Sequence, residues 1–289
     1  MPRPGAVRGG WPANSSQEKP FMQTEHILPC ALLKKPIRVA VVGAGGNGSA
    51  VLLQLPYLHQ ALRVWGHPYG LDVTVIDGDT VSETNCIRQP FAVSDIGQNK
   101  AEILVSRLNM FWGLKWEVLP AFFTKNSLER RSCDVLISCV DSRKARREIE
   151  VAVTRRDVNA IYWLDLGNGS SSGQYVIGQP RNGVNRQSKS RLRTVSEMFP
   201  EIVDVAAGED DLPSCSAAEA LERQEPFINQ TLAASALAML SRLLRYGKIS
   251  YHGAFFNAAT GRMSALPVDP ERWSKMRRTQ KRKNAAARK

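Results

Sequence analysis

Apolar runs alternate with amphipathic stretches through the first 170 residues of the chain. The apolar runs predict strands, and the stretches with an apolar residue at every third or fourth position predict helices. The predicted strands cover 37–43, 72–77, 115–120, 133–140 and 160–167, and the predicted helices cover 47–64, 100–111 and 143–156. Continuous apolar strands separated by amphipathic helices are typical of a parallel sheet covered on both faces. The pattern therefore predicts an α/β fold with a doubly wound, mostly parallel, Rossmann-like sheet.

The pattern changes after Gly167. SSGQYVIG predicts one more strand, and residues 180–225 then form a long crossover loop with little periodicity. Loops of this length in a compact domain are usually functional or mobile. A helix, INQTLAASALAMLSRLLRY, follows, and Gly247 is expected to cap its C-terminus. YHGAFFNA and GRMSALPV predict a closing pair of strands.

Charge is unevenly distributed between the body of the chain and its ends. The net charge is +12, but residues 37–270 carry 25 basic and 24 acidic residues, whereas residues 271–289 carry nine and one. We expect a disordered N-terminal tail at 1–26, one domain at 27–268 and a basic C-terminal tail at 269–289. Two interpretations of the basic tail stay open, a solvated end or a segment that contacts nucleic acid or an acidic partner.

Cellular location is constrained by three absences in the sequence. No run of about 18 apolar residues appears, so no membrane span is expected. The first 20 residues have no apolar core of the kind that a signal peptide needs. The five cysteines follow no regular pairing pattern, which suits a reducing compartment. A cytoplasmic protein without disulfides is the expectation.

A glycine-rich turn, GAGGNG, directly follows the first apolar strand. Gly43 permits the tight turn, Gly45 lets the backbone approach a phosphate, and Gly48 lets the helix pack on the sheet. The helix N-terminus that follows favours an anion. Alone, this turn leaves open a dinucleotide for redox chemistry and the phosphates of ATP. Asp77 is 34 residues beyond Gly43, farther than the roughly 20 residues usual in dehydrogenases.

Polar motifs after the next strand distinguish a dinucleotide site from an ATP site. In chain order, the sequence has a GxGGxG turn, a D-x-D at a strand end, N-x-x-R-Q, a Lys opening a helix, and an Asp ending a strand. The residues are Gly43, Gly45, Gly46 and Gly48; Asp77 and Asp79; Asn85, Arg88 and Gln89; Lys100; and Asp141. This order resembles the adenylating superfamily that includes ThiF, MoeB and the ubiquitin-activating enzymes.

The resemblance implies that a carboxylate attacks the α-phosphate of ATP. It implies that Arg88 and Lys100 contact the phosphates and that Asp141 holds Mg²⁺, consistent with the preference of this ion for carboxylates. It also implies that Asp77 bonds the ribose. Asn85, Gln89, Asp79 and the glycines complete the nucleotide-binding set. The ordinary alternatives are surface positions for the two cations, a turn role for Asp79, and an N-cap role for Asp141.

The cysteines are expected to have different roles. Zinc-bearing members of the superfamily carry two C-x-x-C pairs, which this sequence lacks, so no structural zinc is expected. Cys133 and Cys139 are predicted to be core residues, and Cys86 is expected near the nucleotide without a chemical role. Cys215 lies where thioester-forming members carry a nucleophile on a crossing loop, so it is a candidate acyl acceptor. An ordinary loop cysteine is the alternative.

Residues 27–268 are most similar to the ThiF-like proteins of bacterial PRTRC gene systems, on the segments LDLGNGSSSGQYVIG and PSCSAAEALERQEPFINQT. That resemblance implies a small ubiquitin-like or sulfur-carrier protein as substrate, with conjugating-enzyme-like and JAB-peptidase-like proteins as further partners, and a homodimer. The basic residue that some relatives supply from an N-terminal helix of a partner subunit is not identifiable before Ile37. Two other hypotheses stay open, an NAD-dependent oxidoreductase and a non-catalytic nucleotide-binding scaffold with a nucleic-acid-binding tail.

Overall fold

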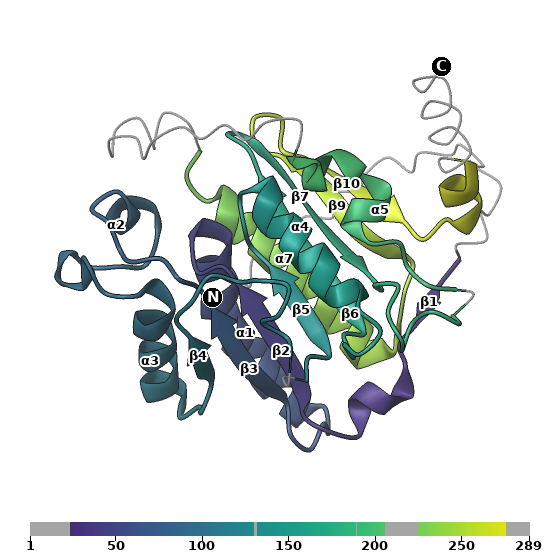
Figure 1. The fold of residues 1–289 in the computed structure, drawn as a ribbon, viewed down its shortest axis with the longest axis horizontal. Coiled ribbons are helices and arrows are strands. Elements are labelled where there is room, and N and C mark those ends of the chain that lie inside the picture. Colours follow the sequence, from purple (N-terminus) through teal and green to yellow (C-terminus); the bar gives the residue numbers. More distant parts are fainter. Residues whose placement is uncertain (1–23, 130–131, 189, 206–224, 276–289) are drawn as a thin grey trace, which may run out of the picture.

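The computed structural model describes residues 24–129, 132–188, 190–205 and 225–275. Eight strands form one sheet in the order β10-β9-β7-β6-β5-β2-β3-β4, and β1 pairs separately with β8. Figure 1 shows α4 on one face of this sheet and α1 and α7 on the other. The predicted doubly wound α/β class is confirmed.

Most boundaries lie within two residues of the predicted ones. The strands are β1 (His26–Ile27), β2 (Ile37–Val42), β3 (Leu71–Ile76), β4 (Glu117–Leu119), β5 (Val135–Ser138), β6 (Tyr162–Asn168), β7 (Ser172–Gly178), β8 (Lys248–Ile249), β9 (Tyr251–Asn257) and β10 (Arg262–Pro267). The helices are η1 (Cys30–Leu33), α1 (Gly46–Val64), α2 (Asn85–Arg88), η2 (Val93–Asp95), α3 (Lys100–Trp112), α4 (Arg143–Thr154), α5 (Val195–Met198), η3 (Pro200–Val203) and α7 (Ile228–Tyr246).

The sheet has a parallel half and an antiparallel half. Strand β2 pairs in parallel with both β3 and β5, and β4 and β6 extend the same direction outward. Strands β7, β9 and β10 are antiparallel to their neighbours. Because all five parallel strands point the same way, the chain leaves each at one common edge, and the loops that follow β2, β3 and β5 lie together there.

Three helices have a capping residue at one end, α3 and α4 at the N-terminus and α7 at the C-terminus. Asn99 accepts the Glu102 N–H at 3.1 Å at the start of α3, and the Ser142 hydroxyl accepts the Ala145 N–H at 3.1 Å at the start of α4. Gly247 ends α7 with φ +70°, which confirms the predicted cap. Local sequence therefore fixes where these helices stop and where the loops at the sheet edge begin.

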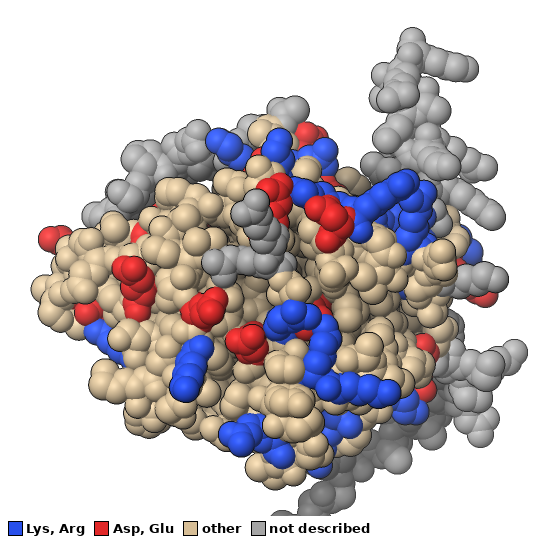
Figure 2. Space-filling view, turned by 60° about the horizontal axis from the view of Figure 1, so that its bottom comes forward, with Lys and Arg blue, Asp and Glu red and all other residues tan. Residues whose placement is uncertain are grey.

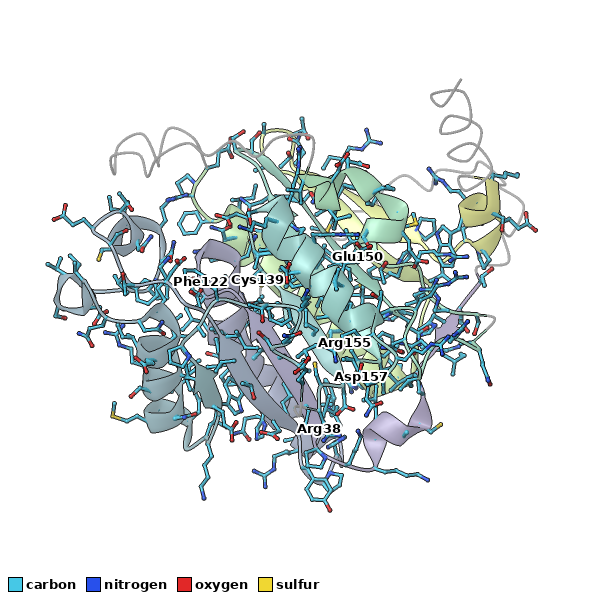
Figure 3. All side chains as sticks on the ribbon, viewed as in Figure 1. Arg38, Phe122, Cys139, Glu150, Arg155 and Asp157 are labelled. Atoms are coloured by element: carbon cyan, nitrogen blue, oxygen red, sulfur yellow. The ribbon has the colours of Figure 1, made fainter. Side chains whose placement is uncertain are left out.

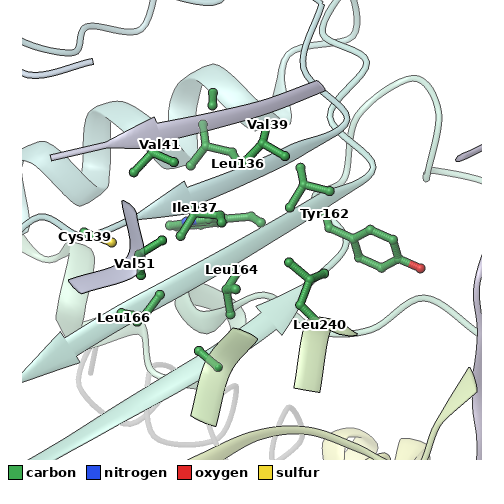
Figure 4. Packing of buried hydrophobic residues seen from close by; sticks show 14 of the residues in the cluster. Val39, Val41, Val51, Leu136, Ile137, Cys139, Tyr162, Leu164, Leu166 and Leu240 are labelled. Atoms are coloured by element: carbon green, nitrogen blue, oxygen red, sulfur yellow. The ribbon is translucent and has the colours of Figure 1, made fainter. Parts of the chain in front are cut away.

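The core lies between the sheet and its helices (Figure 4). Val41, Val51 and Leu164 are each fully buried within it. Cys133 and Cys139 are also buried, as predicted, and burial raises the pKa of the Cys133 thiol to about 12. These two thiols are packing groups.

The described part of the crossover segment is more ordered than its lack of periodicity suggests. It contains the short helices α5 and η3. The Asn182 amide donates to the Ala160 carbonyl at 2.6 Å, and the Arg191 guanidinium binds both carboxylate oxygens of Glu197 at 2.5 and 2.7 Å. Buried amides and a paired arginine hold the segment to the sheet. The periodicity of apolar residues does not predict such polar contacts.

The body of the molecule carries mixed charge. In Figure 2, basic and acidic side chains are interspersed over the face in view. This distribution agrees with the near balance of charges between residues 37 and 270. Past residue 268, Trp273 is 5 % exposed and its ring contacts that of His252, so packing continues into the start of the predicted tail. Within the described part of the chain, no helix is long and apolar enough to cross a membrane.

Candidate functional site

The glycine turn lies at the carboxyl edge of the parallel strands, between β2 and α1. Gly43 has φ +92°, and a Cβ on it would lie 2.9 Å from the Cys139 carbonyl oxygen. A Cβ on Gly48 would lie 1.9 Å from the Gly43 carbonyl oxygen. Both positions therefore require glycine, for backbone conformation at one and for close approach at the other. The turn is held against the end of β5.

Asp77 supports the glycine turn from the end of β3. Its carboxylate accepts the Ala44 N–H and, at 2.7 Å, the Asp79 N–H. Burial raises the pKa of Asp77, and these backbone donors act in the opposite direction. The side chain thus ties two loops of the site together, and the predicted contact with a ribose stays a prediction.

Lys100 is held at the same edge by Asp79. Its ammonium lies 3.1 Å from an Asp79 carboxylate oxygen, and its backbone N–H donates to the Asp79 carbonyl at 3.0 Å. The Lys100 residue is 8 % exposed, whereas half of the Asp79 side chain is exposed. Lys100 is therefore not the exposed surface charge of the ordinary interpretation, because its side chain is buried and pairs with Asp79 beside Asp77.

The N-x-x-R-Q motif lies on and after the short helix α2. The side-chain oxygen of Asn85 accepts the Ser82 N–H at 3.0 Å, and Arg88 is half-buried. The buried side-chain oxygen of Gln89 has no hydrogen-bond partner in the described part of the chain. Figure 1 shows α2 above the carboxyl edge, on the side of the sheet that carries α3. The nucleotide contacts implied for these three residues remain predictions.

Asp141 follows β5 and precedes α4. Its side chain is exposed and its carboxylate has no partner among the described residues, while its carbonyl accepts from Arg146 Nη1 at 3.2 Å. The alternative N-cap role belongs to Ser142. An exposed carboxylate next to a glycine turn suits Mg²⁺ bound to a nucleotide, since Mg²⁺ takes one or two protein carboxylates together with phosphates. In the described ranges, no group of three or more His, Cys, Asp or Glu is placed to hold a metal ion.

A buried polar network behind Asp141 was not anticipated. Asp165 is fully buried on β6 and accepts from Arg146 Nε at 3.2 Å and from the Ser138 hydroxyl at 2.6 Å. The Trp163 indole N–H donates to that hydroxyl at 2.7 Å. Arg146 therefore joins α4 to β6 and also holds the backbone of Asp141. Two features of the sequence could have indicated this network. They are an acid within the apolar strand YWLDLG and an arginine on the apolar face of a predicted helix.

Two asparagines beside the glycine turn were also missed. Asn47 is in the first turn of α1, and its amide donates to the side-chain oxygen of Asn168 at 2.8 Å. Asn229, in the first turn of α7, is 6 % exposed. Its amide nitrogen lies 2.6 Å from the position of a Cβ on Gly46. Gly46 therefore leaves room for a side chain from a distant segment, and no local pattern marks Asn229.

The loops of the candidate site lie at one edge of the sheet. Figure 3 shows Cys139, which follows β5, and Phe122, which follows the edge strand β4, at this edge, whereas Arg155 and Asp157 lie at the far end of α4. Arg155 is paired with Asp157 and Glu129 and has no place near the glycine turn. Uncommitted or half-exposed polar groups at the carboxyl edge can bind a nucleotide and a cation. Cys215, the candidate acyl acceptor, lies outside the described residues.

Solved structures with the same fold are recognisable at low sequence identity. PaaA matches with a TM-score of 0.54 and 17 % identity, over 82 % of this chain and 65 % of its own. MccB of E. coli with ATP matches with a TM-score of 0.54 and 15 % identity, over 83 % and 66 %. A structure of MccB with AMPCPP and MccA gives the same values. The chain thus spans about two thirds of the length of these proteins.

No curated protein sequence matches this chain significantly. A family model does, over residues 31–283, which include the glycine turn, Lys100, Asp141 and the whole sheet. On this match, the chain belongs to the ThiF family.

Proposed function

We propose that this protein uses ATP and Mg²⁺ to adenylate the C-terminal carboxylate of a small ubiquitin-like or sulfur-carrier protein. One observation carries the proposal. The glycine turn, the buried Lys100 ammonium and the uncommitted Asp141 carboxylate lie at one edge of the sheet in a ThiF-family chain. A redox dehydrogenase needs neither a buried cation nor a free carboxylate at this place.

In the proposed reaction, an oxygen of the substrate carboxylate attacks the α-phosphorus of ATP. The bond from this phosphorus to the bridging oxygen breaks, and pyrophosphate leaves with its electron pair. The glycine turn and the N-terminus of α1 hold the phosphates, and Lys100 stabilises charge on the departing pyrophosphate. Asp141 holds Mg²⁺, which neutralises further charge on the triphosphate. Arg88 is proposed to contact the phosphates as well.

The finer parts of the proposal concern partners and a later step. MccB has been solved with MccA, which supports a binding partner for the present chain. We propose Cys215 as the acceptor of the acyl group, a homodimer as the working form, and conjugating-enzyme-like and JAB-peptidase-like proteins as further partners. In the thioester step, the Cys215 sulfur would attack the carbonyl carbon and AMP would leave.

ATP–pyrophosphate exchange tests the adenylation. We expect exchange that depends on the ubiquitin-like protein encoded nearest to this chain, and we expect Cys215→Ala to keep exchange while losing any thioester. Absence of ATP binding, together with absence of exchange with every candidate carrier, would refute the proposal. Thermal stabilisation by NAD and not by ATP would instead support an oxidoreductase.

A further inference from the structure

Two helix N-termini meet at the glycine turn, those of α1 and α7. The amide of Asn229, at the start of α7, lies against Gly46, the first residue of α1. At the other end, the Arg245 guanidinium lies over the Trp65 ring, 4.6 Å from its centroid, just beyond the last residue of α1. The two 19-residue helices therefore run parallel, with both N-termini at the carboxyl edge of the sheet.

Neither of these two N-termini is capped by a side chain, and neither has an acidic residue in its first turn. By contrast, α3 and α4 each have a capping side chain. The first N–H groups of a helix have no partner within the helix, and together with the helix dipole they favour an anion. Uncapped N–H groups of both helices thus face the same place.

Asn229 supplies an independent indication of a ligand. The residue is 6 % exposed, and its side-chain amide makes no hydrogen bond to the residues that the structure describes. Of its atoms, the nitrogen approaches Gly46 most closely: a Cβ on that glycine would lie 2.6 Å from Nδ2, 3.1 Å from Cγ and 3.3 Å from Oδ1. An amide that is largely withdrawn from solvent and makes no hydrogen bond within the protein is available to a ligand. Its donor is directed at the turn.

We infer that Asn229 and the N-terminus of α7 form the second half of an anion site, which binds the α-phosphoryl group of the nucleotide opposite the α1 turn. This inference rests on the proposed function and adds a residue to its binding site. A phosphate oxygen beside Gly46 meets the first N–H groups of α1 and the amide of Asn229. In a site of this kind, charge that develops at the α-phosphorus during attack is stabilised from both sides.

Nucleotide binding by Asn229→Ala tests this role, with adenosine, AMP, ADP and ATP as the ligands in calorimetry. A hydrogen bond to a charged group corresponds to about a tenfold or greater change in affinity. We therefore expect the dissociation constants of AMP, ADP and ATP to rise about tenfold and that of adenosine to stay unchanged. Asn229→Asp should weaken the three phosphorylated ligands further, because it adds a negative charge at the site.

Gln230→Ala is the matched control, since Gln230 is an exposed amide in the same helical turn. It should leave all four constants unchanged, and the melting temperatures of both alanine variants report whether the fold is retained. Equal losses for adenosine and ATP, or no loss for any ligand, would overturn the inference. If the wild type binds no ATP, the proposed function itself fails. If the wild type shows exchange and Asn229→Ala binds nucleotides as tightly as the wild type does, this inference fails and the proposed function stands.

Discussion

The crossover segment and the carboxyl edge differ in how their polar side chains are paired. In the segment from Gln179 to Val205, the described polar side chains that are buried are matched to partners, as in the pair Arg191 and Glu197. At the carboxyl edge, Asp141 is exposed without a carboxylate partner and Asn229 is buried without a partner, both with respect to the described residues. Groups of the first kind hold the fold together, whereas groups of the second kind are available to ligands.

Asp141→Ala should give the largest effect, because it removes a proposed charge-neutralising ligand. We expect pyrophosphate exchange to fall about a thousandfold, equivalent to about 4 kcal/mol in the activation barrier. The melting temperature should change little, since the side chain is exposed. Asp72→Ala is the control, because Asp72 is an exposed acid near the opposite end of β3. Exchange at the wild-type rate in Asp141→Ala would contradict the proposed role of this carboxylate in binding Mg²⁺.

Mild acid should weaken the part of the fold around His26 and His252. Burial lowers the pKa of each imidazole from 6.5 to about 4. His26 Nε2 lies 2.8 Å from the Tyr162 hydroxyl, and His252 Nδ1 lies 3.0 Å from the Ile177 carbonyl oxygen. Between pH 6.5 and 4 the unfolded chain binds more protons than the folded one, so stability is complete above pH 6.5 and falls as pH falls.

At pH 5, each of these imidazoles should cost about 2 kcal/mol of the free energy of unfolding relative to pH 7.5. Urea midpoints at the two pH values measure this loss. In His252→Gln, which cannot titrate, the dependence on pH should be smaller by about half. An unchanged dependence in that variant would place the acid sensitivity elsewhere in the molecule.

Arg191→Ala should damage the fold and spare the chemistry. Arg191 is 7 % exposed, and although burial raises the pKa of Glu197, the bonds from this guanidinium hold that pKa below its ordinary value. Removing one partner leaves the other charge half-buried, at a cost of about 3 kcal/mol. We expect the urea midpoint to fall while the affinity for ATP stays within about twofold. A lost ATP affinity at unchanged stability would extend the nucleotide site into the crossover segment.

The periodicity of the sequence was sufficient for the parallel half of the sheet, because its central strands β2, β5 and β6 are nearly continuous apolar runs. It also predicted the strand over β7, but not its direction, since the direction of pairing depends on long-range contacts. The helices α5 and η3 have four residues each and leave no periodic pattern. The bonds between Arg191 and Glu197 hold α5 through side chains rather than through an apolar face.

Motif order alone is enough to place Gly43, Lys100 and Asp141 at one edge, because loops after parallel strands meet there. Motif order does not predict the residues that support these groups. Arg146 and Asp165 are paired through the interior, and Asn229 approaches Gly46 across more than 180 residues. The sequence assigns Gly46 only to the nucleotide-binding set, whereas in the structure its missing side chain accommodates Asn229.

Ser142→Ala should have the smallest effect and separates two neighbouring residues by role. The Ser142 hydroxyl caps α4 by accepting the Ala145 N–H, so its loss should cost about 1 kcal/mol of stability. Arg146 still holds the Asp141 carbonyl at 3.2 Å and pairs with Asp165, and these contacts keep the loop in place without the cap. Exchange should therefore fall no more than about threefold, measured alongside the urea midpoint. If exchange instead falls as far as in Asp141→Ala, the cap positions the carboxylate, and the division between structural and ligand-binding groups does not hold within this loop.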